Sequence, residues 1–266
     1  LPQAPAARTR APWRITLQVW NALLLREAVA RMFARRAALA WLVLEPIAHI
    51  GVMVFVMAVL RVRHVGGIDI VLWLLTGMLA FFLFRRVGTQ GAAAIGANQA
   101  LFTYRQVKPV DTVIVRCALE ALLMLLIAAA VVGGAALLGM PLHAHDPLTV
   151  IAAVAGLWLL GLGYGLCVSV ANELMPEVGN VVDMLLVPLY LASGVIFPVS
   201  AIPYPYREWA MLNPVAHGVE AARSGLAAYY HVAAELDLGY LFAWALVLLF
   251  LGLALQVRHR RRLGAS

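Results

Sequence analysis

The sequence predicts an all-α, polytopic membrane protein, and three observations lead to this fold class. Apolar residues make up 64% of the 266-residue chain and charged residues only 12%, about half the charged share of a soluble domain. The mean hydropathy is +0.89, which excludes disorder, a coiled coil and an ordinary water-soluble enzyme. Six apolar runs are each close to the roughly 20 residues that a transmembrane helix needs. They cover residues 38–60, 68–84, 117–139, 148–171, 181–203 and 239–257.

The basic residues predict which side of the membrane each loop occupies. Six spans place both termini on one side, and sixteen of the twenty basic residues fall on that side. Because loops rich in Arg and Lys stay in the cytoplasm, we expect cytoplasmic N- and C-termini, with residues 258–266 as a basic tail. The Arg residues cluster at the edges of apolar runs, so the high pI does not indicate binding to nucleic acid.

The N-terminal segment is predicted to hold a helix that does not cross the membrane. Residues 1–14 form a polar tail, and residues 15–36 place apolar side chains at helical spacing beside basic ones, among them Arg31, Arg35 and Arg36. This pattern is typical of an amphipathic helix on the cytoplasmic face of a membrane. A short cytosolic helix packed on protein is the alternative.

The first span carries polar residues that are costly in lipid. Glu45 is followed by Pro46, and His49 lies one turn further along the same helical face. A kinked helix with a polar stripe could line a passage, and a polar pair that packs against a neighbouring helix is an equal alternative. In span three, the spacing of Arg116 and Glu120 predicts a structural ion pair.

Span four is rich in glycine. Gly161 and Gly165 form a small-xxx-small pattern, which favours close packing of helices. A nucleotide-binding loop is excluded because no strand precedes these glycines.

The segment 194–225 before the last span is predicted to be a re-entrant helical hairpin on the external side. A break at residues 193–198 ends span five near its outer end. Asn213 and Pro214 are then typical of a helix start, and the helix over 215–224 carries His217, Glu220 and Arg223. Short, interrupted helices of this kind favour a re-entrant segment, with a plain external loop as the alternative.

The internal loop 85–116 holds an exposed apolar cluster beside basic residues, and Pro109 ends it. This pattern suits docking into a groove on a soluble partner, with a membrane-surface helix as the alternative. The candidate docking residues are Leu101, Phe102, Thr103, Tyr104, Arg105 and Lys108.

Motifs that would indicate an enzyme are missing from this sequence. A P-loop needs a Gly-Lys-Ser/Thr string, and the single lysine, Lys108, lies in a different context. The HExxH and GxSxG motifs are absent too. His143, His145 and Asp146 could touch a metal, but a solvated loop is the better interpretation. We therefore expect no catalytic residue, no metal site and no cofactor bound by this chain.

Five stretches of this sequence resemble the inner-membrane permeases of capsular polysaccharide exporters (the KpsM type), which are transmembrane subunits of type-2 ABC exporters. The similarity runs in order through nearly the whole chain. The stretches are LEPIAH (44–49), FFLFR (81–85), YRQVKPVD (104–111), SGVIFP (193–198) and LNPVAHGVEAAR (212–223).

The resemblance implies a homodimer that works with two copies of a separate cytoplasmic ABC ATPase, which binds the ATP and magnesium. It maps the coupling helix of the family onto about residues 93–104, and implies a periplasmic adaptor and an outer-membrane channel as further partners. The implied substrate is a lipid-linked polysaccharide, moved across the bacterial inner membrane.

Candidate pathway residues follow from the composition of the spans and from this resemblance. Flat aromatic faces can bind sugar rings without fixing one register, so aromatic residues suit a sliding polymer. The candidates are Trp41, Glu45, His49, Tyr190 and Phe197, with Arg31, Arg35 and Arg36 at the cytoplasmic entrance to attract negative charge.

Other functions stay open at this point. A related permease could export O-antigen, teichoic acid, or a drug or lipid. An intramembrane enzyme that modifies glycans would need a polar cluster at the midplane, for which only Glu45 and His49 are available. An ion-coupled carrier should show an inverted repeat, which the two halves of the chain lack.

Overall fold

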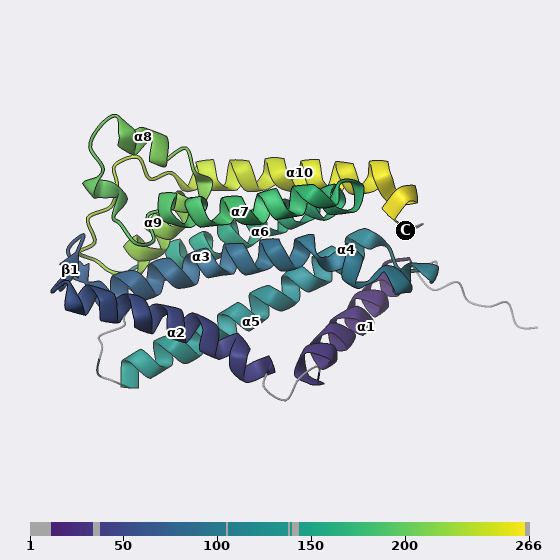
Figure 1. Ribbon diagram of the computed structural model, residues 1–266, viewed down its shortest axis with the longest axis horizontal. Coiled ribbons are helices and arrows are strands. Elements are labelled where there is room, and N and C mark those ends of the chain that lie inside the picture. The colour runs from purple at the N-terminus through teal and green to yellow at the C-terminus, as the bar shows by residue number, and fades with distance from the viewer. Residues whose placement is uncertain (1–11, 34–37, 105, 138, 140–143, 264–266) are drawn as a thin grey trace, which may run out of the picture.

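The computed structural model describes residues 12–33, 38–104, 106–137, 139 and 144–263. They form a bundle of long helices, with the β hairpin and α8 at one end and α4 near the other (Figure 1). The elements are α1 (Pro12–Phe33), α2 (Ala38–Val59), β1 (His64–Val65), β2 (Ile68–Asp69), α3 (Ile70–Ala92), α4 (Ala94–Ala97), η1 (Gln99–Thr103), α5 (Pro109–Leu137), α6 (Pro147–Leu174), α7 (Pro176–Ala192), η2 (Val199–Ala201), α8 (Tyr206–Ala210), α9 (Pro214–Leu226) and α10 (Leu238–Leu263).

The predicted all-helical membrane class is confirmed. Within the described residues, α3, α5, α6 and α10 are long and apolar enough to cross a membrane. The apolar part of α2 that the structure describes, Leu44–Val59, is shorter, and α7 has 17 residues. The count of six spans therefore stays a prediction. The small hairpin of β1 and β2 was not predicted. Helix α3 begins at Ile70, two residues after the predicted start of span two, because the side chain of Asp69 caps the helix by accepting a hydrogen bond from the N–H of Val71.

Helix α6 lies at the centre of the bundle, where it packs against α3, α9 and α10. A Cβ atom added to Gly165 would lie 3.2 Å from the Cα of Gly91 on α3. One added to Gly163 would lie 2.7 Å from the backbone nitrogen of Leu249 on α10. The glycines thus let backbones meet directly, and the predicted close packing of this span is confirmed.

Several helices run past the apolar segments that predicted them. Helix α3 continues to Ala92 and α5 begins at Pro109, so the predicted loop 85–116 shrinks to residues 93–108. Helix α10 continues to Leu263, which makes most of the predicted tail helical. Hydropathy marks contact with lipid, whereas a helix continues until a proline or a capping residue ends it.

The predicted bounds of span five, residues 181 and 203, are both wrong. Helix α7 begins at Pro176 and ends at Ala192. Gly194 then takes a φ of +71°, a left-handed conformation that ends the helix and that glycine adopts without strain. The chain continues through η2 and α8, at the end of the bundle that also holds the β hairpin (Figure 1).

The side chain of Arg223, on α9, joins three helices at this end. It is fully buried. Its guanidinium donates to the carbonyls of Gly194 (2.7 Å) and Val195 (3.1 Å), just beyond α7, and to the carbonyl of Trp73 (3.3 Å) on α3. The same group lies 3.8 Å from the centre of the Trp73 ring. Gly77 leaves the space that the guanidinium occupies.

Glu220 and His217, the other two residues named for the predicted re-entrant segment, are also buried, and both make hydrogen bonds inside the protein. Glu220 accepts hydrogen bonds from Arg223 (3.2 Å) and from the hydroxyl of Tyr230 (2.8 Å). The Nδ1 atom of His217 accepts from the N–H of Asp237 (2.9 Å), so its Nε2 atom carries the proton and donates to the carbonyl of Met211 (2.7 Å). These contacts make α9 a structural element that fixes the ends of α3 and α7.

Replacing Arg223 with methionine should lower the free energy of unfolding by about 3–5 kcal/mol, because Glu220 would keep a buried charge without a cation. The half-exposed pair of Arg207 and Glu235 supplies the control, since Arg207→Met should cost less than about 1 kcal/mol. Thermal melting of the two detergent-solubilised variants checks this. Equal losses of stability would contradict it.

Candidate functional site

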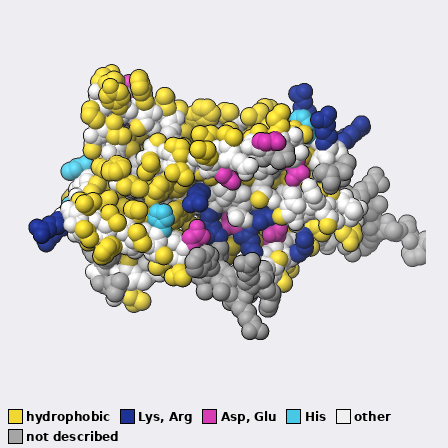
Figure 2. Space-filling model, viewed as in Figure 1, with side chains coloured by type: hydrophobic (Ala, Val, Ile, Leu, Met, Phe, Trp, Pro, Cys, Tyr) yellow, Lys and Arg dark blue, Asp and Glu magenta, His cyan; other side chains and the backbone are white. Residues whose placement is uncertain are grey.

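A largely apolar cavity that also contains charged and polar side chains opens between α2, α3 and α7. It has a volume of about 630 Å³, and the polar side chains that line it include His49, Arg85, Asp183 and Tyr190. A second cavity of about 160 Å³ shares His49 and Arg85 and adds Glu45. We call the two together the α2–α7 cleft. Figure 2 shows charged side chains of both signs in a band on the face where these helices lie.

Aromatic rings form one wall of the α2–α7 cleft. The ring of His49 meets Phe82 and Tyr190 edge to face, with centroids 5.4 Å and 6.0 Å away. Phe81 lies 4.9 Å from Tyr190 in the same way. The hydroxyl of Tyr190 is 3.4 Å from Nε2 of His49. The wall therefore offers apolar ring edges together with groups that can exchange hydrogen bonds.

The structure brings together three of the five pathway residues predicted from sequence. Glu45, His49 and Tyr190 line the α2–α7 cleft. Phe197 is exposed beyond the end of α7 and is not among the residues that line the cleft. Trp41 lies in α2, and its side chain is outside the described set.

Arg85 is a cleft residue that sequence reasoning missed. The sequence analysis placed it in the internal loop, whereas α3 continues past it and turns it into the cleft. The spacing of Phe81, Arg85 and Thr89 is the signal that could have found it, because residues four apart share a helical face. All three line the larger cavity.

A buried charge network beside the cleft holds α1 against the bundle. Glu120 on α5 is fully buried and accepts hydrogen bonds from Arg31 on α1 and from Arg86 on α3. Arg116 instead donates to Gln90 (3.0 Å) and lies 4.0 Å from Glu27. The predicted pair of Arg116 and Glu120 is therefore wrong, because helices packed on α5 offer both residues other partners.

The charge network also changes the interpretation of the predicted cytoplasmic entrance. Burial lowers the pKa of Arg31 to about 10, and the positive charges of Arg116 and Arg86 lower it as well, against the opposing effect of Glu27. Arg31 is still charged at neutral pH, but its guanidinium is committed to Glu120. Arg35 and Arg36 lie outside the described residues.

Helix α1 is further fixed to the segment that follows α3. Asn98 accepts a hydrogen bond from Arg26 (2.8 Å) and donates to Glu27 (3.0 Å). Trp20 donates to Asp111 (2.9 Å) at the start of α5. One face of α1 is thus packed on protein, as the alternative interpretation expected. Its opposite side exposes apolar residues that suit a membrane surface: Trp13, Leu17, Leu25 and Val29.

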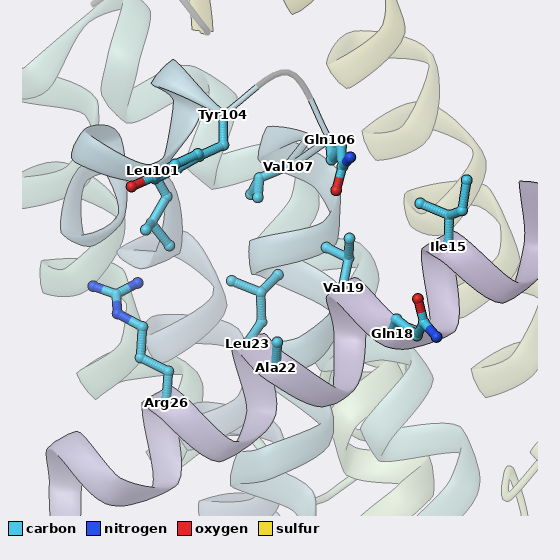
Figure 3. A pocket seen from close by; sticks show the side chains of 10 residues that line it. All are labelled: Ile15, Gln18, Val19, Ala22, Leu23, Arg26, Leu101, Tyr104, Gln106 and Val107. Atoms are coloured by element: carbon cyan, nitrogen blue, oxygen red, sulfur yellow. The ribbon is translucent and has the colours of Figure 1, made fainter. Parts of the chain in front are cut away.

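The candidate docking residues belong to the connection between α3 and α5, which holds α4 and η1 and which we call the coupling segment (residues 93–108). Figure 3 shows Leu101 pointing toward Leu23 and Arg26 of α1 across a cavity of about 400 Å³, which Tyr104 also lines. Phe102 and Lys108 line another cavity, of about 530 Å³, together with Arg260 and Arg261 of α10. The hydroxyl of Thr103 donates to the carbonyl of Ala100, and Arg105 is outside the described residues.

Comparison with known proteins places this architecture in a family. The family described as "ABC-2 type transporter" matches residues 18–227. The chain belongs to the ABC-2 type transporter family. It is 34% identical over 235 residues to a polysialic acid transport protein, KpsM, of Escherichia coli, covering 88% of this chain and 91% of that protein.

Two further ABC-2 relatives carry names of the same kind. The capsule polysaccharide export inner-membrane protein CtrC of Neisseria meningitidis is 30% identical over 254 residues, with 92% of each chain covered. The capsule polysaccharide export inner-membrane protein BexB of Haemophilus influenzae is 26% identical over 241 residues, covering 90% of this chain and 89% of that one. The resemblance stated from the sequence is therefore confirmed.

Replacing Glu120 with alanine should release α1 from the bundle, because Arg31 and Arg86 would lose their shared carboxylate, at a cost of about 3–5 kcal/mol. Faster hydrogen exchange across α1 in the purified protein would show this. Glu177→Ala removes an exposed carboxylate from α7 and should leave the exchange of α1 unchanged. Exchange of α1 at the wild-type rate in Glu120→Ala would contradict a role of this network in holding the helix.

Proposed function

We propose that this chain is the permease subunit of an ATP-driven exporter that moves lipid-linked capsular polysaccharide across the bacterial inner membrane. It works as a homodimer with two copies of a cytoplasmic ABC ATPase, which bind the ATP and magnesium. Family membership supports the transport role, and the names of the three relatives, which refer to polysialic acid or to capsule polysaccharide, support the substrate class. The observation that carries the proposal for this chain is the cleft between α2, α3 and α7, which has an aromatic wall and several charged and polar groups.

The chemistry of the α2–α7 cleft suits a sugar polymer. The ring edges and faces of Phe81, Phe82 and Tyr190 can contact the C–H faces of sugars, and polar groups such as His49 can exchange hydrogen bonds with hydroxyls. Ionisable groups at membrane depth are costly unless they face protein or water. Glu45 and His49 on α2 meet that condition by facing the cleft.

The coupling segment supplies the contact with the ATPase. Tyr104 is exposed at its end, while Asn98 ties the same segment to α1. When ATP closes the two ATPases, a push on this segment would move α1 with it. Helices α2 and α7 would then shift against those of the second copy and open a channel along the dimer axis. A periplasmic adaptor and an outer-membrane channel would receive the polymer.

A cytoplasmic location of both termini accompanies this mechanism. Helix α1, the coupling segment and the C-terminal end of α10 lie at one end of the bundle, opposite the β hairpin and α8 (Figure 1). Arg260 and Arg261 stand at that end, close to Lys108. The excess of basic residues there supports its placement in the cytoplasm.

The alternatives make different demands. A permease for O-antigen, teichoic acid, or a drug or lipid would share the fold, and the names of the three relatives favour the capsule branch. An intramembrane enzyme acting on glycans would use Glu45 and His49 for catalysis. It would then act on a lipid-linked sugar without an ATPase.

Changing the exposed Tyr104 to glutamate should weaken the binding of the ATPase to the permease by about 2 kcal/mol or more, which is roughly a thirtyfold loss of affinity. This is the effect expected when an aromatic residue at the centre of an interface is lost. The measurement is the amount of P-loop ATPase that co-purifies with tagged permease from native membranes. Tyr229→Glu, on an exposed tyrosine at the other end of the bundle, is the matched control. If the permease purified without an ATPase and yet modified a lipid-linked sugar, the proposed exporter function would be wrong.

Shortening the cleft side chains should reduce export without disturbing assembly. We expect His49→Ala and Tyr190→Ala each to slow polysaccharide export by about tenfold, the effect of losing about 1.4 kcal/mol of favourable contact, while the ATPase still co-purifies. Phe55→Ala alters an exposed ring on α2 that does not line the cleft, and it should export normally. Capsule at the cell surface is the readout, and normal export by both cleft variants would exclude this pathway.

A further inference from the structure

We propose that the α2–α7 cleft contains an anion-binding site centred on Arg85, which receives an anionic oxygen group of the exported molecule. Two parts of a lipid-linked acidic glycan carry such groups: the carboxylates of its sugars and the phosphate of its lipid anchor. The inference rests on the proposed function, because it names the chemistry that the cleft recognises.

The position of Arg85 gives a ligand access to its guanidinium. The residue follows directly after the predicted apolar run of α3, about 10 Å from the end of the helix at 1.5 Å per residue. Its side chain is exposed and lines both cavities of the cleft. Anything that enters either cavity therefore meets this group.

The charge of Arg85 is available, unlike that of its neighbours. Arg31 and Arg86 share Glu120, Arg116 lies beside Glu27, and Arg223 is bound to Glu220. No carboxylate in the described part of the chain lies within 4.0 Å of the side-chain nitrogens of Arg85. An exposed arginine at the edge of an apolar span can keep its charged group in water, so the guanidinium of Arg85 stays charged and free to bind an anion. A guanidinium also offers a planar fork of donors that matches a carboxylate or a phosphate.

The remaining charges of the cleft affect how tightly an anion is held. Asp183 and Glu45 line the two cavities together with Arg85. Their negative charges repel an anionic group that is not bound by the guanidinium. A transport pathway needs this balance, since binding must be favourable enough for entry and weak enough for release. The site is thus suited to a passing polymer more than to a retained ligand.

Neighbouring polar groups define what else touches the anion. The Thr89 hydroxyl donates to the carbonyl of Arg85 itself (2.9 Å), and Gln90 accepts from Arg116 (3.0 Å). The Thr89 hydrogen and the Gln90 oxygen are thus occupied within the protein, whereas the side-chain NH2 group of Gln90 can still donate. Tyr190 and His49, which lie 3.4 Å apart on the wall of the cleft, are further groups that can bind the sugar beside the anionic oxygen.

The experiment measures equilibrium binding to the full-length permease in nanodiscs of neutral lipid, so it needs no ATPase. Three fluorescent probes are used: a sialic acid oligomer, the same oligomer with its carboxylates converted to methyl esters, and phosphatidic acid. The variants are Arg85→Gln and Arg85→Lys, with Arg63→Gln as the control, because Arg63 is exposed next to the β hairpin and lines no part of the cleft.

We expect Arg85→Gln to weaken binding of at least one acidic probe by about tenfold, equivalent to about 1.4 kcal/mol, and to leave binding of the ester unchanged. Arg85→Lys should fall between wild type and Arg85→Gln, since it keeps the charge and loses the fork. A loss confined to the sialic acid oligomer assigns the site to the sugar carboxylates. A loss confined to phosphatidic acid assigns it to the lipid phosphate.

Three results would overturn the anion site: wild type binds neither acidic probe, Arg85→Gln binds both as wild type does, or Arg85→Gln loses the ester as strongly as the acid. None of these results depends on the ATPase or on export.

If the wild-type protein assembles with an ATPase and exports polysaccharide while Arg85→Gln binds both acidic probes as wild type does, the exporter function is supported and only the anion site is excluded. If no ATPase co-purifies, the proposed function fails separately.

Discussion

The buried guanidinium of Arg223 is the interaction on which the end of the fold next to the β hairpin depends. It satisfies two carbonyls that α7 leaves open where the helix ends, and it stacks on Trp73 of α3. Glu220 compensates its charge and in turn accepts a hydrogen bond from Tyr230. Because α9 fixes the ends of α3 and α7 together, it also sets the spacing of two of the three helices that form the α2–α7 cleft.

The opposite end of the bundle is organised by a second set of charges, which connects the coupling segment to the cleft. Asn98 joins that segment to α1, and Glu120 joins α1 to α3 through Arg31 and Arg86. Arg86 is adjacent to Arg85, and both line the smaller cavity of the cleft. In the proposed mechanism, a displacement of the coupling segment would reach the cleft through these hydrogen bonds and ion pairs between side chains.

Much of this arrangement could be predicted from the sequence, and the rest depends on contacts between distant residues. Apolar runs located α3, α5, α6 and α10, and Asn213 and Pro214 located α9, because these signals are local. The break after α7 was located by the stretch 193–198, but its partner could not be predicted, since the carbonyls of residues 194 and 195 are satisfied by an arginine almost thirty residues later. The partners of Glu120 were missed for the same reason, because Arg31 and Arg86 come from helices that only packing brings close. The sequence named His49 and Tyr190 but not Arg85, as hydropathy ended span two before α3 ends.

The glycine contacts of α6 have a mechanical consequence. Where Gly165 meets Gly91, and where Gly163 meets the backbone at Leu249, the helices touch without side chains that could rotate to absorb a shift. We therefore expect α3, α6 and α10 to form a rigid unit that keeps its shape while other helices move. Helices α2 and α7 stand at its margin with exposed apolar surfaces. Movement during a transport cycle would fall to these two, and the fixed wall of the cleft would carry Arg85.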